Sequence, residues 1–376
     1  MTTNQLTIAD RTLISKGSQR GMLATMHLEE VRDMLGKMAQ KQDAVDYERT
    51  LNQLHVQFKE GRLQAQWMNA NGLNPEVMYF SDHGANMVAS EVLPSRFFSG
   101  LKTLAGIDEQ GEKLATMSWA KLSQARKDQP VRMVRTANMR IDDSVHRVIR
   151  SCHSQGYAPY SNFEFVNDLL NNAGEYADLP VLHWKVTDGG MRLRFAGDSV
   201  DQLEIGRPMP MIEAWNSEVG LRRVGLRGGQ FVLKCTNGMG HWNEKTEYGW
   251  IHRGNSDRIR NGVQNAFENL RVTASTVIDA YNEALNVQID NAFMWMEQEL
   301  EGKVSDRVLR SAQAGLADPT TTPGGLLASV VDAVTLIAQN EIDMYQQFEI
   351  EKVASSLLAK GLGIARSNDN RIRVMV

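Results

Sequence analysis

The hydrophobic pattern of the chain changes its period twice, and this change limits the fold more than any single motif does. Apolar residues recur every three or four positions over 22–67 and 83–126, alternate in short stretches between 131 and 235, and return to helical spacing after 256. A helix buries a stripe with a period near 3.6 residues, whereas a strand buries every second residue. Helices followed by consecutive strands and then by helices predict an α+β fold with a central antiparallel sheet.

Three regions follow from this pattern. Residues 1–75 are expected to form an N-terminal helical extension, because an apolar stripe starts at Leu23 and continues to Phe58 at helical spacing. Residues 76–275 are expected to form an α+β core that begins with further helices. Residues 276–376 are expected to form long amphipathic helices.

The core contains a clear β-hairpin signal. Two alternating runs, 181–186 and 191–195, are joined through Asp188-Gly189-Gly190, a sequence typical of a tight turn. Arg192 and Arg194 alternate with apolar residues in the second run. In a hairpin with one solvated face, both arginines are expected to be exposed.

Glycines and a long amphipathic stretch complete the expected elements. Strands are predicted over 221–226 and 230–235, with Gly228-Gly229 as the turn between them, and Asn237-Gly238 marks another tight turn. From 257 to 300 the apolar spacing predicts one helix of about 40 residues, or roughly 60 Å. A helix of that length is expected to be kinked or to pack on a partner.

Charge is distributed unevenly, although the net charge is only −4. Residues 126–150 contain seven basic and three acidic side chains, and residues 216–260 contain eight and four, so each stretch carries +4. Residues 276–361 contain five basic and thirteen acidic side chains, which gives −8. The middle of the chain is therefore basic and its C-terminal helices are acidic.

Aromatic residues lie among the basic residues of the second stretch. Basic groups neutralise phosphates and aromatic faces stack on unpaired bases, a combination that suits single-stranded nucleic acid. The alternative is that the aromatics belong to the core and that the arginines are solvated or paired. Candidate phosphate contacts are Arg132, Arg135, Arg222, Arg223, Arg227, Lys234, Lys245, Arg253, Arg258 and Arg260, and candidate stacking residues are Trp242 and Trp250.

Catalytic motifs are scarce. The chain has no phosphate loop, dinucleotide fingerprint or His-Glu-x-x-His motif. Cys235, His241 and His252 offer three zinc-ligand types, so a metal-dependent enzyme is an alternative, but their spacing matches no compact zinc module. A buried thiol and two ordinary histidines are the other explanation. No cofactor is predicted, and a non-enzymatic protein is favoured.

Composition indicates the compartment. Two cysteines favour a reducing environment, the polar start has no apolar signal core, and no run approaches the roughly 18 apolar residues of a membrane span. These features predict a cytoplasmic protein that does not interact with a membrane.

Two pairs of motifs resemble a known family. Arg132-Met133-Val134-Arg135-Thr136 and Gly156-Tyr157-Ala158-Pro159-Tyr160-Ser161-Asn162 look like its first signature, and Asn216-Ser217-Glu218-Val219-Gly220 and Cys235-Thr236-Asn237-Gly238 look like its second. His252-Arg253-Gly254 matches the basic histidine that follows. From about residue 78 to residue 358, the chain resembles the phage and plasmid family named domain of unknown function 932. Ser154-Gln155 departs from its usual aspartate and arginine.

This resemblance implies a mobile genetic element in a bacterial host cell, and a role in DNA replication, recombination or conflict with the host. The strand-strand-helix core is similar in outline to phage single-strand annealing proteins of the Red-beta and Erf kind, which is an analogy of fold. The leading hypothesis is a non-enzymatic homo-oligomer that binds single-stranded DNA. The alternative is a protein-binding anti-defence or structural factor, whose partner would contact the acidic helices.

Overall fold

The computed structural model describes thirteen stretches of the chain and leaves the rest undescribed. Within them, the backbone alone is described for parts of several elements, among them 231–234, 237–246 and 271–273. The described stretches are 12–16, 26–69, 72–73, 76–93, 97–125, 130–173, 180–196, 208–234, 237–273, 275–316, 325–340, 344–367 and 371–372.

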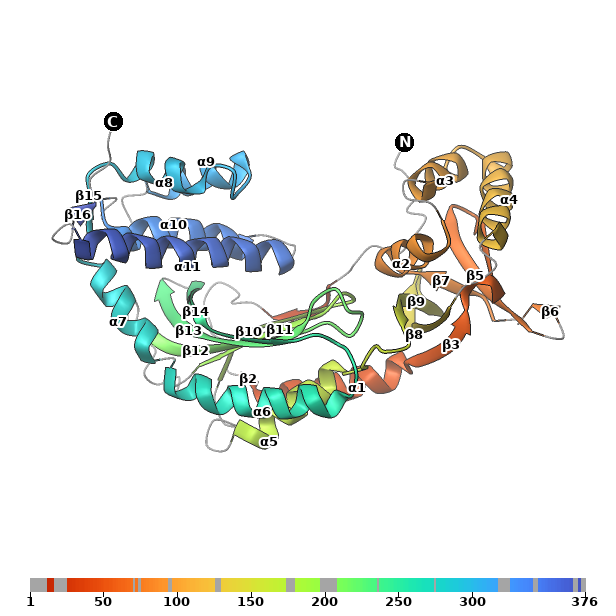
Figure 1. The fold of residues 1–376 in the computed structure, drawn as a ribbon, viewed down its shortest axis with the longest axis horizontal. Helices are drawn as coiled ribbons and strands as arrows, with labels where there is room; N and C mark the ends of the chain where they lie inside the picture. The colour runs from red at the N-terminus through yellow and green to blue at the C-terminus, as the bar shows by residue number, and fades with distance from the viewer. Residues whose placement is uncertain are drawn as a thin grey trace.

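A large antiparallel sheet, here called the main sheet, forms the centre of the larger lobe (Figure 1). Its strands pair in the order β1, β10, β11, β12, β13, β14, and β2 pairs with β10. Consecutive strands from β10 to β14 are therefore neighbours, as expected for hairpins. The bounds are β1 Thr12–Lys16, β2 Met26–His27, β10 Pro180–Thr187, β11 Met191–Ala196, β12 Pro208–Asn216, β13 Val224–Lys234 and β14 Asn237–Trp250.

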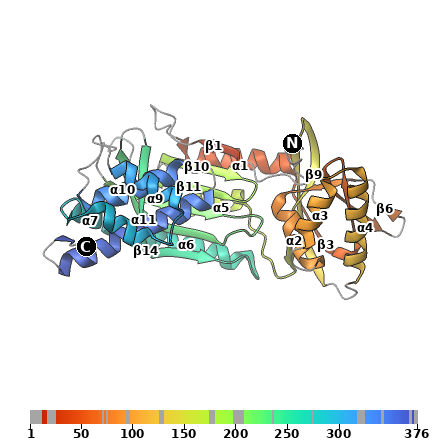
Figure 2. The same cartoon turned by 90° about the horizontal axis from the view of Figure 1, so that it is seen from above.

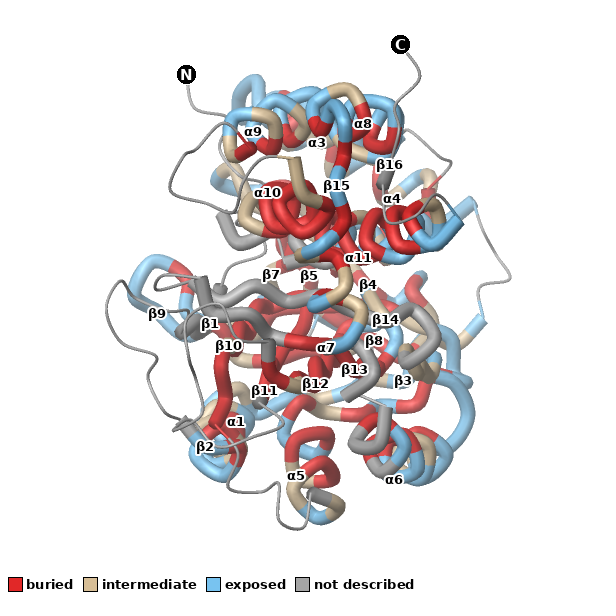
Figure 3. The backbone as a smooth tube through the Cα atoms, turned by 90° about the vertical axis from the view of Figure 1, so that its left-hand side faces the viewer, coloured by how far each residue is buried: buried red, intermediate tan, exposed pale blue. Residues whose placement is uncertain are grey.

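Helices cover both faces of the main sheet (Figure 1). One face packs on α1 (Leu28–Gln42), α5 (Asn162–Ala173) and α6 (Ser256–Thr273), in an apolar core that includes Leu193 and Phe267. Figure 3 shows buried residues along the strands between the helical layers.

The other face lies beneath a set of helices that we call the C-terminal layer. This layer has an apolar core of its own, centred on residues such as Trp295 and Leu357. Its elements are α7 (Ser275–Ala284), β15 (Gln288–Ile289), α8 (Ala292–Leu300), α9 (Asp306–Leu316), α10 (Leu327–Asn340), α11 (Met344–Ser367) and β16 (Arg371–Ile372).

A second sheet forms a separate small lobe beside the main sheet (Figure 2). Its strands pair in the order β3, β8, β9, β7, β5, β4, and β6 pairs with β5; β7 and β9 are parallel and the other pairs antiparallel. Phe80 and Trp119 belong to its core. The bounds are β3 Val45–Thr50, η1 Leu51–Gln53, β4 Leu54–Lys59, β5 Arg62–Asn69, β6 Gly72–Leu73, β7 Met78–Phe80, α2 Asp82–Val92, α3 Phe97–Ala105, α4 Glu109–Ala125, β8 Val131–Ile141 and β9 Ser144–Ser154.

The α+β class and the central antiparallel sheet are confirmed, but the helical extension is wrong beyond α1. Residues 45–69 form β3, η1, β4 and β5 of the small lobe. In β4, Leu54, Val56 and Phe58 alternate with less buried residues, which is the burial of a strand. Glu60 and Gly61 have positive φ values of 53° and 69°, as a tight hairpin turn requires.

Two further expectations in the second half of the chain are corrected. Gly228 and Gly229 do not form a turn, because they lie inside the continuous β13 and pair with Ile212 and Met211 of β12. The long helix predicted from 257 to 300 is divided into α6, α7 and α8. Between α7 and α8, the backbone of Ile289 donates to Gly325 O at 2.7 Å, so the chain there pairs with the segment before α10.

Candidate functional site

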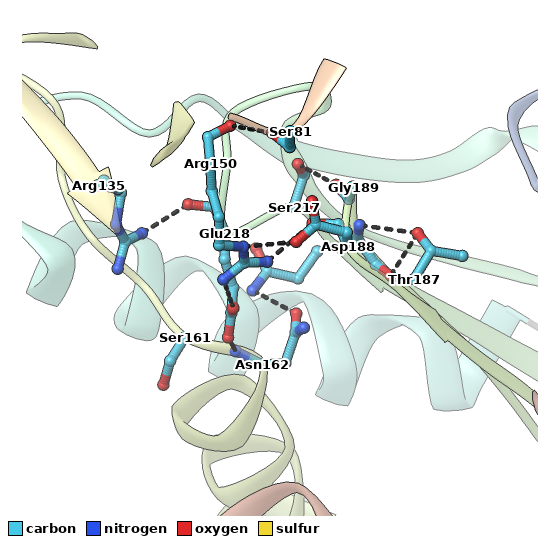
Figure 4. A network of polar contacts seen from close by, with 12 residues as sticks. Ser81, Arg135, Arg150, Ser161, Asn162, Thr187, Asp188, Gly189, Ser217 and Glu218 are labelled. Carbon is cyan, nitrogen blue, oxygen red and sulfur yellow. Dashed lines mark hydrogen bonds and ion pairs between the residues drawn. The ribbon is translucent and has the colours of Figure 1, made fainter. Parts of the chain in front are cut away.

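Arg150, in β9 of the small lobe, makes the principal polar contact between the two lobes (Figure 4). Its Nε donates to Asp188 Oδ1 at 2.6 Å, and its Nη2 donates to Asp188 O at 2.8 Å. Its Nη1 donates to Glu218 Oε2 at 3.1 Å. Arg150 and Asp188 are buried, so the planar guanidinium holds the β10–β11 turn and the segment after β12 in one position.

Glu218 connects the lobes to helix α5. Its Oε1 accepts from the backbone N–H of Asn162, the first residue of α5, at 2.7 Å, and its backbone oxygen accepts from Arg135 Nη1 at 2.6 Å. Burial alone would raise the pKa of Glu218, but Arg150 and the Asn162 N–H lower it below its usual range. The Asn-Ser-Glu-Val-Gly motif therefore has a structural role here, and Ser217 adds a bond from its Oγ to Gly189 O at 2.6 Å.

Two histidines flank Tyr157 at the same junction, and a third, His83, lies with its Nε2 3.0 Å from Val219 O. The ring of Tyr157 stacks on His153 with centroids 3.8 Å apart and on His252 with centroids 5.2 Å apart. Burial lowers the pKa of His153 to about 3, and it also lowers the pKa values of His83 and His252. Gly220 has a φ of +73°, and an added Cβ would lie 2.6 Å from the His153 ring, so this position requires glycine.

A second polar centre lies on the main sheet beneath α11, and it corrects the expected exposure of Arg192 and Arg194. These arginines are only 1% and 5% exposed. Both bond Glu213 of β12 and Glu351 of α11. The C-terminal layer covers this face of the hairpin, so water does not reach it, and Glu213 and Glu351 together balance the charges of Arg192 and Arg194.

Arg227 of β13 completes this cluster. Its Nε donates to Glu213 Oε2 at 2.6 Å, and its Nη2 lies 3.2 Å from Glu351 Oε2. Burial lowers the pKa of Arg227 to about 10. Burial would raise the pKa of Glu213, but the surrounding arginines, Arg192 first, hold it far below its usual range. The arginines, Arg192 first, also lower the pKa of Glu351 against the effect of burial, so both carboxylates are ionised at neutral pH.

Several predicted phosphate contacts are engaged in ion pairs. Arg132 Nε donates to Glu91 Oε2 at 3.1 Å, and Arg135 Nε donates to Asp46 Oδ1 at 2.9 Å. Arg227 is buried against Glu213 and Glu351. These three arginines therefore have structural partners in this conformation.

The remaining described candidates lie at one end of the main sheet, where β13 begins, β14 ends and α6 begins. Arg223 is 47% exposed and bonds Glu247 at 2.5 Å, while Arg222 bonds Glu349 at 3.1 Å. Arg260 bonds Asp168 at 2.9 Å. Arg253 and Arg258 are exposed. The register that pairs Val224 with Trp250 places the start of β13 beside the end of β14.

Of the two tryptophans predicted to stack on bases, the structure describes the side chain of Trp250 only. Trp250 is half-buried and packs on α6, where an added Cβ at Gly262 would lie 2.2 Å from its Nε1. This indole therefore contributes to the core. The side chains of Lys234, Trp242 and Lys245 lie outside the described part of the structure.

The predicted metal site is also only partly described. His252 lies with its Nδ1 3.1 Å from Ala158 O, in the junction, whereas the side chains of Cys235 and His241 lie outside the described residues. Among the residues that the structure places, no three His, Cys, Asp or Glu side chains gather as metal ligands would. Cys152 is buried, and burial raises its pKa to about 12, so its thiol is not a nucleophile here.

Sequence reasoning missed the acidic members of both polar centres. In sequence, Asp188 is typical of a turn residue, Glu213 lies in a strand of mostly apolar residues, and Glu351 is one of several charged residues of an amphipathic helix. A charged residue amid buried positions is a signal for a buried ion pair. The identity of its partner, however, depends on contacts between distant parts of the chain.

The chain was compared with known families, proteins and structures. No family model matches it, and neither a curated protein nor a solved structure does. No helix in the described stretches has the length and apolar character needed to cross a bilayer. The resemblance to the phage and plasmid family, carried by motifs such as Asn216–Gly220, therefore stays a prediction.

Proposed function

We propose that the protein binds single-stranded nucleic acid, without catalysing a reaction, at the end of the main sheet. We call this surface the basic end and define it by Arg222, Arg223, Arg253 and Arg258. The observation that carries the proposal is the exposure of Arg253 and Arg258 beside the partly exposed Arg223. In contrast, Arg132 and Arg135 are paired with Glu91 and Asp46 of the small lobe, and Arg227 is paired with the buried Glu213.

Local structure supports this choice. Helix α6 begins at Ser256 between Arg253 and Arg258. The Asp257 N–H already donates to Asn255 Oδ1, so the phosphate contacts proposed here come from the arginine side chains and not from the helix start. Leu221 and Ile251, which flank the arginines in sequence, are exposed and offer apolar contact to bases. Phosphate contacts of this kind bind without sequence preference, which suits a protein that coats or anneals single strands.

Salt-dependent binding of a labelled oligothymidylate tests the proposal. The variant carrying Arg253→Gln and Arg258→Gln should bind more weakly, and its log-log salt slope should be shallower by about 0.7 for each phosphate that it no longer neutralises. Arg140→Gln, at an arginine that is 74% exposed on the small lobe, is the matched control and should change little. Absence of binding at low salt, or equal slopes in all three proteins, would refute the proposal.

A protein-binding role is the second candidate, and an exposed apolar surface on α3 and α4 favours it. Ile107 is 69% exposed and Met117 57% exposed, and Phe97 and Leu114 are exposed as well. Leu114 and Met117 are three positions apart on α4 and so share a face of that helix, and exposed apolar faces are found at protein interfaces. Under this alternative, Leu114→Gln with Met117→Gln abolishes capture of a stoichiometric protein partner, whereas substitutions at Arg253 and Arg258 do not.

The two candidates differ in their ligand and in the lobe that binds it. The resemblance to a phage and plasmid family supports the first one and adds a role in annealing or recombination. An assay of annealing between two complementary labelled strands tests that role. The rate should rise with protein in the wild type and should rise less when Arg253 and Arg258 are both replaced by glutamine.

A further inference from the structure

The main sheet carries a row of three arginines that faces the C-terminal layer. Arg192 and Arg194 project from β11 and Arg227 projects from β13, with Glu213 of β12 between them. We call Arg192, Arg194 and Arg227 the arginine row. Helix α11 reaches this row through Glu351, whose carboxylate contacts all three guanidinium groups.

The contact between α11 and the arginine row is polar, although it is buried. Most apolar side chains of the strands lie on the opposite face, in a core that ends at Leu270, and the C-terminal layer has a separate core that starts at Tyr281. On the face of the arginine row, Met211 and Trp215 of β12 are also buried. Among the described side chains, neither core spans both layers. The attraction within a buried ion cluster is largely offset by the cost of removing its charges from water. The ion cluster itself therefore fixes the position of α11 while contributing little net free energy.

The carboxylate of Glu351 occupies the arginines in the way that a phosphate group would. The guanidinium fork binds carboxylate and phosphate oxygens with the same paired geometry. Glu213 belongs to the sheet and stays with the row, whereas Glu351 belongs to the covering helix. A ligand phosphodiester that replaced Glu351 would bring the same single negative charge and two oxygens to these three arginines.

A second carboxylate of α11 marks the rim of this contact. Glu349 is exposed and accepts from Arg222 Nη2 at 3.1 Å. Arg222 belongs to the basic end, so the arginine row and the basic end lie on either side of the same helix. Nucleic acid bound at the basic end would lie close to α11. Its phosphates would compete with Glu349 for Arg222 and with Glu351 for the arginine row.

We infer that the arginine row is a second phosphate-binding site, which Glu351 occupies in this conformation and a phosphate-rich ligand occupies when α11 is displaced. That the ligand is nucleic acid rests on the proposed function, whereas free polyphosphate shares its chemistry. Binding at this site and docking of α11 exclude each other. The acidic C-terminal layer therefore competes with the phosphate ligand for the basic face of the sheet.

Two substitutions in α11 test the inference. Glu351→Gln removes the charge that occupies the row, and Glu349→Lys repels Arg222 at the rim without altering the buried cluster. Glu297→Lys makes the same charge change as Glu349→Lys at an exposed position of α8 and is the matched control. Each protein is titrated with labelled oligothymidylate and with inorganic polyphosphate, and hydrogen exchange of α11 is measured with and without polyphosphate.

Glu351→Gln and Glu349→Lys should each bind polyphosphate about tenfold more tightly than Glu297→Lys, since the competing carboxylate is removed or weakened. The gain of Glu351→Gln should disappear when Arg194→Gln is added. Polyphosphate should also accelerate exchange of the α11 amides in the wild type. If Glu351→Gln fails to fold, the Glu349→Lys comparison and the wild-type exchange still decide the question.

The outcomes separate the two proposals. Gains below roughly threefold for both variants and both probes, or a gain that survives Arg194→Gln, would overturn the second site. Binding of oligothymidylate by the wild type without any gain in the variants would overturn the second site and leave the proposed function intact. A gain with polyphosphate alone, and no binding of oligothymidylate by any variant, would keep the second site and remove the proposed function.

Discussion

Arg150 and Glu218 form an ion pair, with Nη1 and Oε2 3.1 Å apart, that joins the sheet of the small lobe to the main lobe. The same guanidinium bonds Asp188, so one side chain from β9 satisfies two carboxylates of the main lobe. Lobes that meet at a small interface usually move relative to one another. This shared arginine opposes such motion, because separating the lobes would leave buried charges without partners.

Replacement of Arg150 by lysine should destabilise the protein even though the charge is conserved. A lysine ammonium does not reproduce the planar fork, so Asp188 or Glu218 would lose its partner. We expect the free energy of unfolding in urea to fall by about 3 kcal/mol. Arg140→Lys, at an exposed position, should change it by less than about 0.5 kcal/mol. Equal effects of the two substitutions would show that Arg150 is no more important than a surface charge.

Two helical glycines should respond to alanine with opposite signs. An added Cβ at Gly84, in α2, would lie 2.2 Å from Ile149 O of β9, whereas one at Gly100, in α3, would meet no atom within 4 Å. We expect Gly84→Ala to lower the free energy of unfolding by about 2 kcal/mol or more through overpacking. Gly100→Ala should raise it by about 0.5 to 1 kcal/mol, because alanine favours the helix. Thermal unfolding of both variants measures the difference, and shifts of the same sign would contradict the expectation.

Elements that depend on the local hydrophobic pattern and on turn residues could be predicted from the sequence. The β10–β11 hairpin around Asp188-Gly189-Gly190 is confirmed. A local motif also begins α5, where Glu164 N donates to Ser161 Oγ at 3.1 Å, as in a capping box. The helix predicted through residue 58 is wrong, because apolar residues at 45, 51, 54 and 58 fit helical spacing by coincidence. The alternation within β4 and the glycine at position 61 indicate instead a strand that ends in a tight turn.

The polar centres could not be predicted, because their partners lie far apart along the chain. Arg194 and Glu351 are separated by 157 positions, and the alternation in β11 shows only that Arg194 shares a face with Arg192, not which residue covers that face. Hairpins often leave one face in water, so the pattern alone favours exposure. The two basic stretches can be identified from the sequence. Which of their arginines form ion pairs and which lie at the exposed basic end is determined only when the sheet has formed.

Acid should destabilise the junction through its histidines. Burial lowers the folded pKa of His252 below the usual value of 6.5, so the unfolded chain takes up a proton before the folded protein does. Stability is then present above about pH 6.5 and is lost as the pH falls toward the folded pKa. His83 and His153 of the junction shift in the same direction, as does His183 of β10. We therefore expect the free energy of unfolding to fall by about 1 kcal/mol or more per pH unit between roughly pH 6.5 and 5.

Replacement of His252 by asparagine tests this account. An asparagine side chain can still donate to Ala158 O, so the variant should stay folded at neutral pH with some loss of packing on Tyr157. Its stability should depend less on pH than that of the wild type, by up to about 1 kcal/mol per pH unit below roughly pH 6.5. Urea unfolding at a series of pH values gives both slopes, and identical slopes would exclude a contribution from His252.

The rate at which a thiol reagent labels the buried Cys152 measures how often the small lobe opens. Burial raises the pKa of its thiol to about 12, and Glu91 adds to that shift, so the reactive thiolate is scarce in the folded state. In a Cys235→Ser variant, we expect a thiol reagent near pH 8 to label Cys152 at least about 1,000-fold more slowly than in urea. Adding Arg150→Lys should accelerate the reaction if junction and core open together, whereas Arg140→Lys should not. Fast labelling of the folded Cys235→Ser protein would contradict the burial of Cys152 between the sheet and α2.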